Sequence, residues 1–378
     1  MAVRDRLAEK GIGHVRILVP LMYGERQLKI LSEEQHEDPF AIYLDEGFGK
    51  MLREVVFENG DFAQHLSRLN SRFDAVSGLV SNRFAIDAPP IEARSLGTGS
   101  TVWIYPSDVI ATIDTAARIP VPAPKRYFAF PTLTSEILAE AQEQPGCLGF
   151  SRVDMEKVRA RMAEMEAGYS QVFIPEVNSL SFKYADDLSG QPTVIEGRSR
   201  VYTPATKAEV APTSGNVDIP GIYAMFSGTK ATREQNLALV SHLRESGIAV
   251  YMPEWETTVQ GAIPISPSVL PYRNIMAIFG RSGWGTGWQA QNLAKPWLVT
   301  PYHAGDDPEI CFNNMTIEAL GIGKVLDPGR LDMQELKRLL RDLPAGVEAV
   351  NSRIREKFGT LDGIAYTAGH VAEDLATS

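Results

Sequence analysis

A glycine-rich turn between an apolar run and an amphipathic segment places the strongest constraint on the fold of this chain. Residues 275–279 are apolar throughout and predict a buried strand, and the apolar spacing after Thr286 predicts a helix. Gly280, Gly283 and Gly285 stand between them, and Gly287 follows Thr286. Glycines let the backbone approach a ligand closely, and the first N–H groups of a helix have no intrahelical partner. Strand, turn and helix together therefore predict an anion-binding site.

A second predicted strand, 297–300, ends in Pro301-Tyr302-His303, and an acidic loop then leads into another predicted helix. The loop carries Asp306, Asp307 and Glu309. In an open α/β sheet, ligands bind at the carboxyl ends of the strands. We therefore expect the glycine turn and the acidic loop to face one crevice.

The order of polar residues through this region is specific. It runs Arg281-Ser282-Gly283-x-x-Thr286-x-x-Gln289, then Lys295-Pro296 before a strand, then Asp307-x-Glu309-x-x-x-Asn313, and last Glu318 before Gly321. This pattern resembles the donor-binding half of GT-B glycosyltransferases, and most closely the branch that contains the UDP-N-acetylglucosamine transferase of peptidoglycan synthesis. The resemblance covers the last third to half of the chain. It implies an α/β fold with two Rossmann-like domains facing a central cleft.

The resemblance also implies roles for individual residues. In that family the glycine turn holds the nucleotide diphosphate, a Glu in the following helix holds the ribose, and an acid/amide pair at the next helix start holds the sugar hydroxyls. Here Gln289 stands at the ribose position, and Glu309 stands where the family usually has Gln. Both side chains can bind hydroxyls. The implied donor site comprises Ser227, Gly228, Thr229, Arg281, Ser282, Gly283, Gly285, Thr286, Gln289, His303, Asp307, Glu309 and Asn313.

Composition excludes several function classes. The formal net charge of −10 and the sequence pI near 5.3 argue against a nucleic-acid-binding surface, which needs clustered Lys and Arg. No apolar run approaches the length of a membrane span. The sequence is compatible with peripheral membrane contact and does not indicate an oligomeric state. The two cysteines, Cys147 and Cys311, form no metal-binding motif. We therefore expect a cytoplasmic protein with neither a disulfide framework nor a structural zinc site.

The length of 378 residues suits two domains. Predicted strands, among them 74–80, alternate with helices through the first half and favour a parallel sheet covered on both faces. A segment rich in Pro, Thr, Ser and Gly then breaks the pattern before a new α/β unit begins. We expect an acceptor-side domain at 1–205, a linker at 206–220, a donor-binding domain at 221–350, and C-terminal helices at 351–378 that return toward the first domain.

The catalytic base is less clearly marked. The family's inverting enzymes usually place a His or an acidic group in the loop after the first strand, within a Gly-Gly-His-like turn. This chain begins instead with a helix and a strand that resemble the second half of that unit, so we expect the N-terminal domain to lack its usual first strand. Glu25 and Asp108 lie at predicted strand ends and are candidate bases.

The C-terminal segment 362–375 has two interpretations. As a strand, a turn and a helix it would supply the missing unit and make His370 the base. As a single helix it would place five residues on one apolar face, namely Ile364, Ala368, Val371, Ala372 and Leu375. The spacing favours the helix, which would leave the base absent or displaced.

The sequence thus predicts a glycosyltransferase that moves a sugar from a nucleotide-diphosphate donor, with a UDP-sugar expected, to an unidentified acceptor. The resemblance alone implies inversion. Asp306, Asp307 and Glu309 form either a metal-binding cluster or sugar contacts that also cap a helix, and we favour the second and expect no cofactor or metal. Two alternatives use the same fold: a nucleotide-sugar-binding protein without catalysis, and a nucleotide-sugar epimerase or hydrolase.

Overall fold

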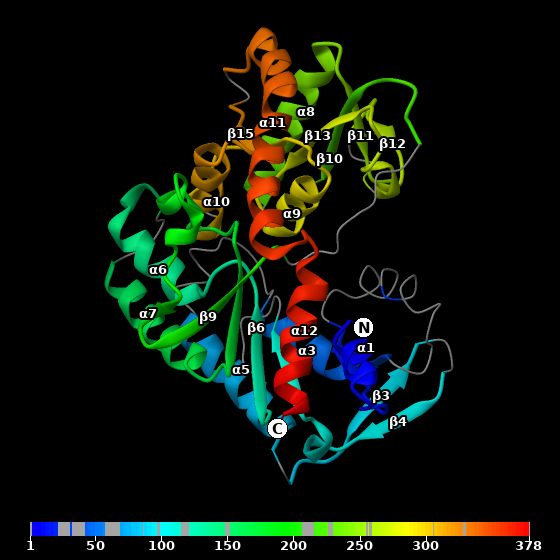
Figure 1. Ribbon diagram of the computed structural model, residues 1–378, viewed down its shortest axis with the longest axis vertical. Coiled ribbons are helices and arrows are strands. Elements are labelled where there is room, and N and C mark those ends of the chain that lie inside the picture. The colour runs from blue at the N-terminus through cyan, green and yellow to red at the C-terminus, as the bar shows by residue number, and fades with distance from the viewer. Residues whose placement is uncertain are drawn as a thin grey trace.

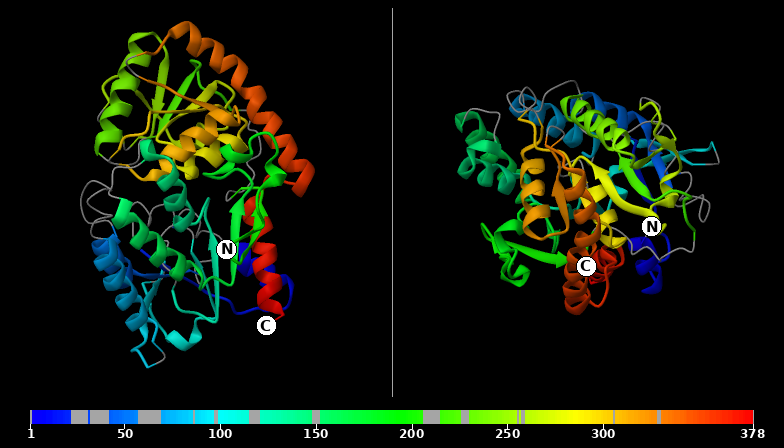
Figure 2. Two further views of the ribbon diagram at one scale, coloured as in Figure 1. Left: turned by 90° about the vertical axis from the view of Figure 1, so that its left-hand side faces the viewer. Right: turned by 90° about the horizontal axis from the view of Figure 1, so that it is seen from above.

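The computed structural model has two lobes, one from each half of the chain (Figures 1 and 2). It describes residues 2–21, 31, 42–56, 69–85, 87–96, 99–114, 121–147, 152–205, 215–225, 230–254, 256, 259–304, 306–327 and 330–377. No helix within these ranges is long and apolar enough to cross a membrane.

The C-terminal lobe contains a six-stranded sheet in which all neighbouring strands are parallel. Its strands are β10 (Gly221–Met225), β11 (Ala249–Met252), β12 (Ile263–Pro264), β13 (Ile275–Gly280), β14 (Trp297–Val299) and β15 (Gly323–Val325). They lie in the order β12-β11-β10-β13-β14-β15. Counted along the chain, this is the order 3-2-1-4-5-6 of the doubly wound dinucleotide-binding fold.

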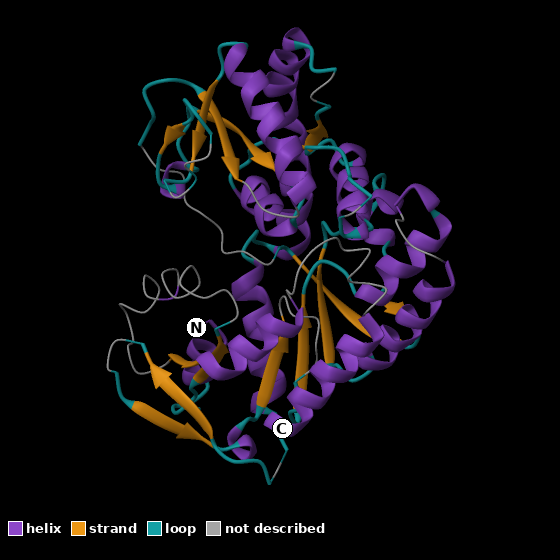
Figure 3. Cartoon of the chain, turned by 180° about the vertical axis from the view of Figure 1, so that it is seen from behind, coloured by secondary structure: helices purple, strands orange, loops and turns teal. Residues whose placement is uncertain are grey.

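Helices cover both faces of this sheet (Figure 3). They are α8 (Lys230–Glu245), α9 (Trp284–Asn292), α10 (Pro308–Ala319) and α11 (Met333–Phe358), with the short 3-10 helix η6 (Pro267–Val269) before β13. The predicted strand at 275–279 and the helix after it are confirmed as β13 and α9. Ile278 and Phe279 are fully buried, because a parallel strand with helices on both faces buries consecutive side chains.

The N-terminal lobe contains two sheets. One is four-stranded, in the order β1 (Ile17–Pro20), β2 (Ile42–Asp45), β3 (Ile91–Ser95) and β4 (Thr101–Ile104). The other is five-stranded, in the order β5 (Ala111–Asp114), β6 (Lys125–Ala129), β7 (Gln171–Pro175), β9 (Arg198–Thr203) and β8 (Val194–Ile195). The helices are α1 (Ala2–Glu9), α3 (Glu46–Val56), α5 (Leu69–Arg83), α6 (Thr134–Glu143) and α7 (Arg152–Glu166), with 3-10 helices η2 (Pro106–Asp108), η3 (Pro145–Cys147), η4 (Ser181–Tyr184) and η5 (Leu188–Gly190).

This lobe departs from the predicted single parallel sheet. The pairs β2–β3 and β3–β4 are antiparallel, and β1 belongs to the smaller sheet instead of the five-stranded one. Residues 74–80, predicted as a strand, lie within α5. Val76 and Val80, four residues apart, share one buried face of that helix, so tertiary packing overrides their preference for strands.

The C-terminal segment forms one helix, α12 (Gly363–Ala376), which confirms the helical interpretation. It packs against β6 and β9 and against α1, so the end of the chain lies on the N-terminal lobe (Figure 1). Val371 and Ala372, on the predicted apolar face, are fully buried. Residues 364–367 are therefore helical and supply no strand to the sheet.

The lobes meet at the segment 176–184, which follows β7 and lies against α9 and α10. The Ser179 hydroxyl accepts a hydrogen bond from Trp284 Nε1 at 2.9 Å, and its carbonyl accepts one from Thr316 Oγ1 at 3.0 Å. Trp284 is the first residue of α9, directly beyond the carboxyl end of β13. The carboxyl edges of the two larger sheets therefore face each other.

Candidate functional site

The predicted glycine turn lies at the centre of the six-stranded sheet. β10 and β13 are its middle strands and are paired as far as Met225 and Gly280. Residues 281–283 follow β13 directly and lead into α9. The loop after β10 carries Ser227, Gly228 and Thr229, which lie outside the described residues. The turn therefore stands where the winding of the sheet reverses, which is the usual place for a ligand in this topology.

The glycines of the turn serve two purposes. A Cβ at Gly280 would collide with the Met225 carbonyl, and a Cβ at Gly287 would collide with the Trp297 ring. These two glycines permit close packing inside the lobe. Gly285 is exposed, and no described atom lies within 4 Å of the position its Cβ would take. Packing therefore does not explain Gly285, which leaves the backbone open to a ligand.

The amino ends of α9 and α10 differ in their caps. Asp307 is the N-cap of α10, and its carboxylate accepts the Glu309 N–H at 2.9 Å. Gly283 is the N-cap of α9, and no described side chain caps that helix. The first N–H groups of a helix carry partial positive charge and attract anions. The Thr286 N–H already donates to the Gly283 carbonyl at 3.0 Å, so the groups that α9 can offer to a phosphate are the N–H groups of Trp284 and Gly285.

Arg281 lies beside the turn and is paired with Asp306. Its Nε and Nη2 donate to the two carboxylate oxygens at 2.9 and 2.7 Å, and Asp306 is 1% exposed. Burial alone would lower the pKa of Arg281, but the hydrogen bonds to Asp306 and the charges of Asp307 and Glu309 raise it. Arg281 therefore stays charged, and Asp306 neutralises it in this conformation.

Asn313 holds the turn in place. Its Nδ2 donates to the Ser282 carbonyl at 2.6 Å, and its Oδ1 accepts from Trp284 Nε1 at 2.7 Å. Its Nδ2 also lies 3.4 Å from Glu309 Oε1. Asn313 and Ser282 are fully buried, and Glu309 is 5% exposed. The side chains that the sequence places at the donor sugar are thus bonded to one another beneath the turn.

The other predicted donor contacts are accessible. Thr286 and Gln289 are partly exposed on α9, His303 is exposed after β14, and Asp307 is partly exposed. Trp284 is buried and joins the turn to Asn313 and to the opposite lobe.

The candidate bases have different positions. Asp108 lies in η2, just before β5, and β5 runs parallel to β6 and β7, so Asp108 is at the amino edge of that sheet. That edge faces away from the C-terminal lobe, which corrects the expectation that Asp108 reaches the crevice.

His370 lies on α12, its ring 4.8 Å from that of Tyr366 and 6.2 Å from that of Phe173. It packs on the face of the sheet and does not follow a strand. Glu25 lies outside the described residues.

The acidic residues after β14 have structural partners. Asp306 pairs with Arg281 and Asp307 caps α10. Across the described ranges, no group of three His, Cys, Asp or Glu side chains is arranged to hold a metal ion. That the function needs no metal or cofactor stays a prediction.

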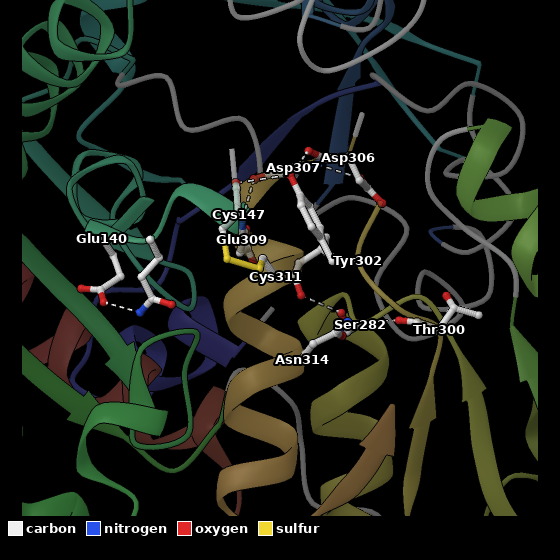
Figure 4. The surroundings of a disulfide bond; sticks show 12 residues. Glu140, Cys147, Ser282, Thr300, Tyr302, Asp306, Asp307, Glu309, Cys311 and Asn314 are labelled. Carbon is white, nitrogen blue, oxygen red and sulfur yellow. Dashed lines mark hydrogen bonds between the residues drawn. A yellow bond between two sulfur atoms is a disulfide. The ribbon is translucent and has the colours of Figure 1, made fainter. Parts of the chain in front are cut away.

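A disulfide joins Cys147 of η3 to Cys311 of α10, with the Cα atoms 5.6 Å apart (Figure 4). This corrects the expectation that the two cysteines stay unpaired. They are separated by 164 residues in the sequence, and no spacing motif connects them. Only the packing of one lobe against the other brings them together.

A scan of family models and a search of curated proteins find no match to this sequence. Solved structures match over nearly the whole chain. UGT89C1 of Arabidopsis thaliana, complexed with quercetin, has a TM-score of 0.58 and 13% identity over 99% of this chain and 95% of that one. TcCGT1 in complex with UDP has a TM-score of 0.58 and 12% identity over 100% of this chain and 95% of that one.

The glycosyltransferase SnogD from Streptomyces nogalater has a TM-score of 0.50 and 16% identity over 99% of this chain and 95% of that one. These neighbours have the GT-B fold of two Rossmann-like domains, and so does this chain. The predicted fold class is therefore confirmed. At such low identity the likeness establishes the fold and leaves the activity to be argued from the site.

Proposed function

We propose that this protein is a glycosyltransferase that moves a sugar from a nucleotide-diphosphate donor, specifically a UDP-sugar, to an acceptor held by the N-terminal lobe. The position of the amino end of α9 carries the proposal. This end follows β13 where the winding of the sheet reverses, its N-cap is Gly283, and Gly285 leaves its backbone open. A diphosphate suits such a helix end because its charge is negative and its oxygens accept several N–H groups.

The structural neighbours support a nucleotide as the ligand. TcCGT1 and LpCGTa were both solved in complex with UDP, and both share the fold of this chain. In the arrangement proposed here, the diphosphate lies at Gly283–Thr286, the ribose beside Gln289 and the sugar toward Glu309. The narrower resemblance to the peptidoglycan UDP-N-acetylglucosamine transferase stays a prediction.

Transfer requires stabilisation of the charge that develops on the departing diphosphate. The N–H groups and the dipole of α9 are already oriented toward that position, so they need no reorganisation during the reaction. Arg281 would add a full positive charge when it releases Asp306. Stereochemical inversion stays a prediction.

Thermal-shift and calorimetric titrations with UDP, GDP and dTDP test the proposal. A ligand that binds the native state alone stabilises it by about 2.7 kcal/mol at a hundredfold excess over Kd. We expect UDP to give the largest shift in Tm. If none of the three nucleotides shifts Tm at millimolar concentration, the proposal is wrong.

The sugar contact is tested separately with Glu309→Ala. This change should weaken binding of a UDP-sugar and leave binding of UDP almost unaltered, because the carboxylate is expected to reach the sugar hydroxyls. An equal loss for both ligands would show that Glu309 acts by holding α10.

Turnover distinguishes the transferase from the other functions open to this fold. Release of UDP from a UDP-sugar without acceptor would indicate a hydrolase, and a changed sugar on intact nucleotide would indicate an epimerase. Binding without turnover across a panel of acceptors would indicate a binding protein.

A further inference from the structure

The disulfide is a side-chain cross-link between the two lobes, which the main chain also joins between α11 and α12. Cys147 belongs to η3 of the N-terminal lobe, and Cys311 belongs to α10 of the C-terminal lobe (Figure 4). Cys147 is buried and Cys311 is partly exposed. Structural disulfides persist in oxidising compartments, and those of reducing compartments usually serve catalysis or redox sensing.

The bridge and the proposed donor contacts lie on opposite faces of α10. Successive residues of an α-helix are rotated by about 100°. Glu309 and Asn313 therefore share one face, toward the glycine turn, and Cys311 points the other way, toward the N-terminal lobe. α10 is thus held between the turn and the opposite lobe, with the disulfide on the outer side.

Non-covalent contacts surround the bridge. Phe312 of α10 stacks on Phe182 of η4, with ring centroids 6.0 Å apart and an interplanar angle of 11°. The Tyr302 hydroxyl lies 3.3 Å from the Cys147 carbonyl oxygen. These contacts hold α10 against the N-terminal lobe in the conformation in which Asn313 is fully buried and Glu309 nearly so. Asn313 bonds to Ser282 and Trp284, so α10 and the turn have to separate before a donor sugar reaches these side chains.

We propose that the Cys147–Cys311 disulfide is a redox clamp on this site. When oxidised, it ties α10 to the N-terminal lobe and slows access of the donor to Glu309 and Asn313. A dithiol reduces it by thiol–disulfide exchange, in which the S–S bond breaks and two electrons and two protons pass to the cysteine sulfurs. The products are two cysteine thiols and one cyclic disulfide of the reductant. That the clamp controls donor access rests on the proposed function.

The clamp itself is tested without nucleotide. The full chain is air-oxidised, and its thiols are counted after denaturation, with and without dithiothreitol. Hydrogen exchange is then measured in α10 and in residues 176–184. We expect no free thiols in the oxidised protein and about tenfold faster exchange in both segments after reduction. Two free thiols in the oxidised protein, or equal exchange in both states, would overturn the proposal.

Donor access is tested by stopped-flow binding of UDP-glucose. We expect the association rate to rise about tenfold on reduction, because binding that waits for a conformational change is slow. The double variant Cys147→Ser, Cys311→Ser should bind at the reduced rate with or without dithiothreitol, which controls for other effects of the reductant. Faster hydrogen exchange with an unchanged association rate would show that the disulfide does not control access of the donor. Faster exchange with no nucleotide binding in either state would confirm the clamp and contradict the proposed function.

Discussion

Arg281 and Asp306 are joined by two hydrogen bonds at the edge of the glycine turn, one to each carboxylate oxygen. Nη1 of Arg281 lies 3.7 Å from the position a Cβ would take at Gly283, the N-cap of α9. The guanidinium is therefore adjacent to the N–H groups proposed to hold a diphosphate. Because Asp306 cancels its charge, this pair sets how strongly the turn attracts an anion.

Asp306→Asn should tighten UDP binding and lower stability. The substitution frees the charge of Arg281 for the diphosphate, for an expected gain of roughly 1 kcal/mol, or about fivefold in Kd. It also breaks a pair whose carboxylate is buried, which costs about 2–3 kcal/mol once the partial exposure of Arg281 is considered. Calorimetry with UDP and urea unfolding measure the two effects. An unchanged or weaker affinity would contradict this role of the pair.

Asp332→Asn is the matched control. It removes the same charge at a distant helix end, where Asp332 accepts the Gln334 N–H at 2.9 Å as the N-cap of α11. Asn caps helices about as well as Asp, so stability should hardly change. UDP affinity should match that of the unaltered protein. Tighter binding by this variant would assign the effect to net charge.

Gly285→Ala should stabilise the fold and weaken UDP binding. A helical glycine is less favourable than alanine by about 0.5–1 kcal/mol, and no described atom would contact the new methyl group. The methyl group would stand between the helix end and a diphosphate, where overpacking by one carbon costs about 1–3 kcal/mol, or roughly tenfold in Kd. Thermal unfolding and calorimetry measure both effects.

Two glycines serve as controls for that prediction. Gly369 lies in α12, and no described atom is within 4 Å of its Cβ position, so Gly369→Ala should raise Tm without affecting UDP. Gly287→Ala should lower Tm, because its methyl group meets the Trp297 ring. If Gly285→Ala leaves UDP affinity unaltered, the diphosphate does not approach this face of α9.

Loss of the disulfide should lower stability. The bridge closes a loop of 164 residues. Chain entropy for a loop of that length gives about 5 kcal/mol, and measured effects are typically about 2–4 kcal/mol. The double variant Cys147→Ser, Cys311→Ser should therefore unfold at a lower urea concentration than the oxidised protein and at the same concentration as the reduced one. Equal midpoints for all three would show that the bridge adds nothing to stability.

The C-terminal lobe is largely predictable because its strands are uninterrupted apolar runs bounded by glycine or proline. β13 and β14 lie at the strands predicted for 275–279 and 297–300. The strand predicted at 74–80 is wrong, since local sequence does not reveal that Val76 and Val80 pack on one helical face. A short polar strand such as β9 carries too little apolar periodicity to be found.

The candidate site also has a part that local sequence predicts and a part that it does not. The glycine turn is predictable because its chemistry is local: a strand, open backbone and a helix end adjoin in sequence. Its supporting contacts join distant residues, as in the bond from Trp284 to Ser179, 105 positions apart, and the disulfide. Such pairs depend on how the lobes pack, which periodicity and composition do not encode.

Lys295, part of the Lys-Pro pair before β14, is placed to hold the start of β13. Its Nζ donates to the Tyr272 carbonyl at 2.9 Å and to the Ile275 carbonyl, and the residue is 8% exposed. Burial lowers the pKa of Lys295 to about 8, from an ordinary value of 10.5. The folded protein therefore keeps a desolvated ammonium at neutral pH, at a cost in stability.

The sign of the resulting pH dependence follows from linkage. Between the folded pKa of about 8 and the unfolded value of 10.5, the unfolded chain binds more protons at this site, so the contribution of Lys295 to stability rises with pH. The cost of burying the Lys295 ammonium is present in full below pH 8. At pH 9.5 this cost is about 2 kcal/mol smaller than at pH 7. Lys295→Met removes this titration but also unpairs two carbonyls, so it should be less stable overall. Urea unfolding of both proteins at pH 7 and pH 9.5 should show their difference widening by about 2 kcal/mol at the higher pH. A difference that stays constant would mean that the two carbonyls hold Lys295 at its ordinary pKa.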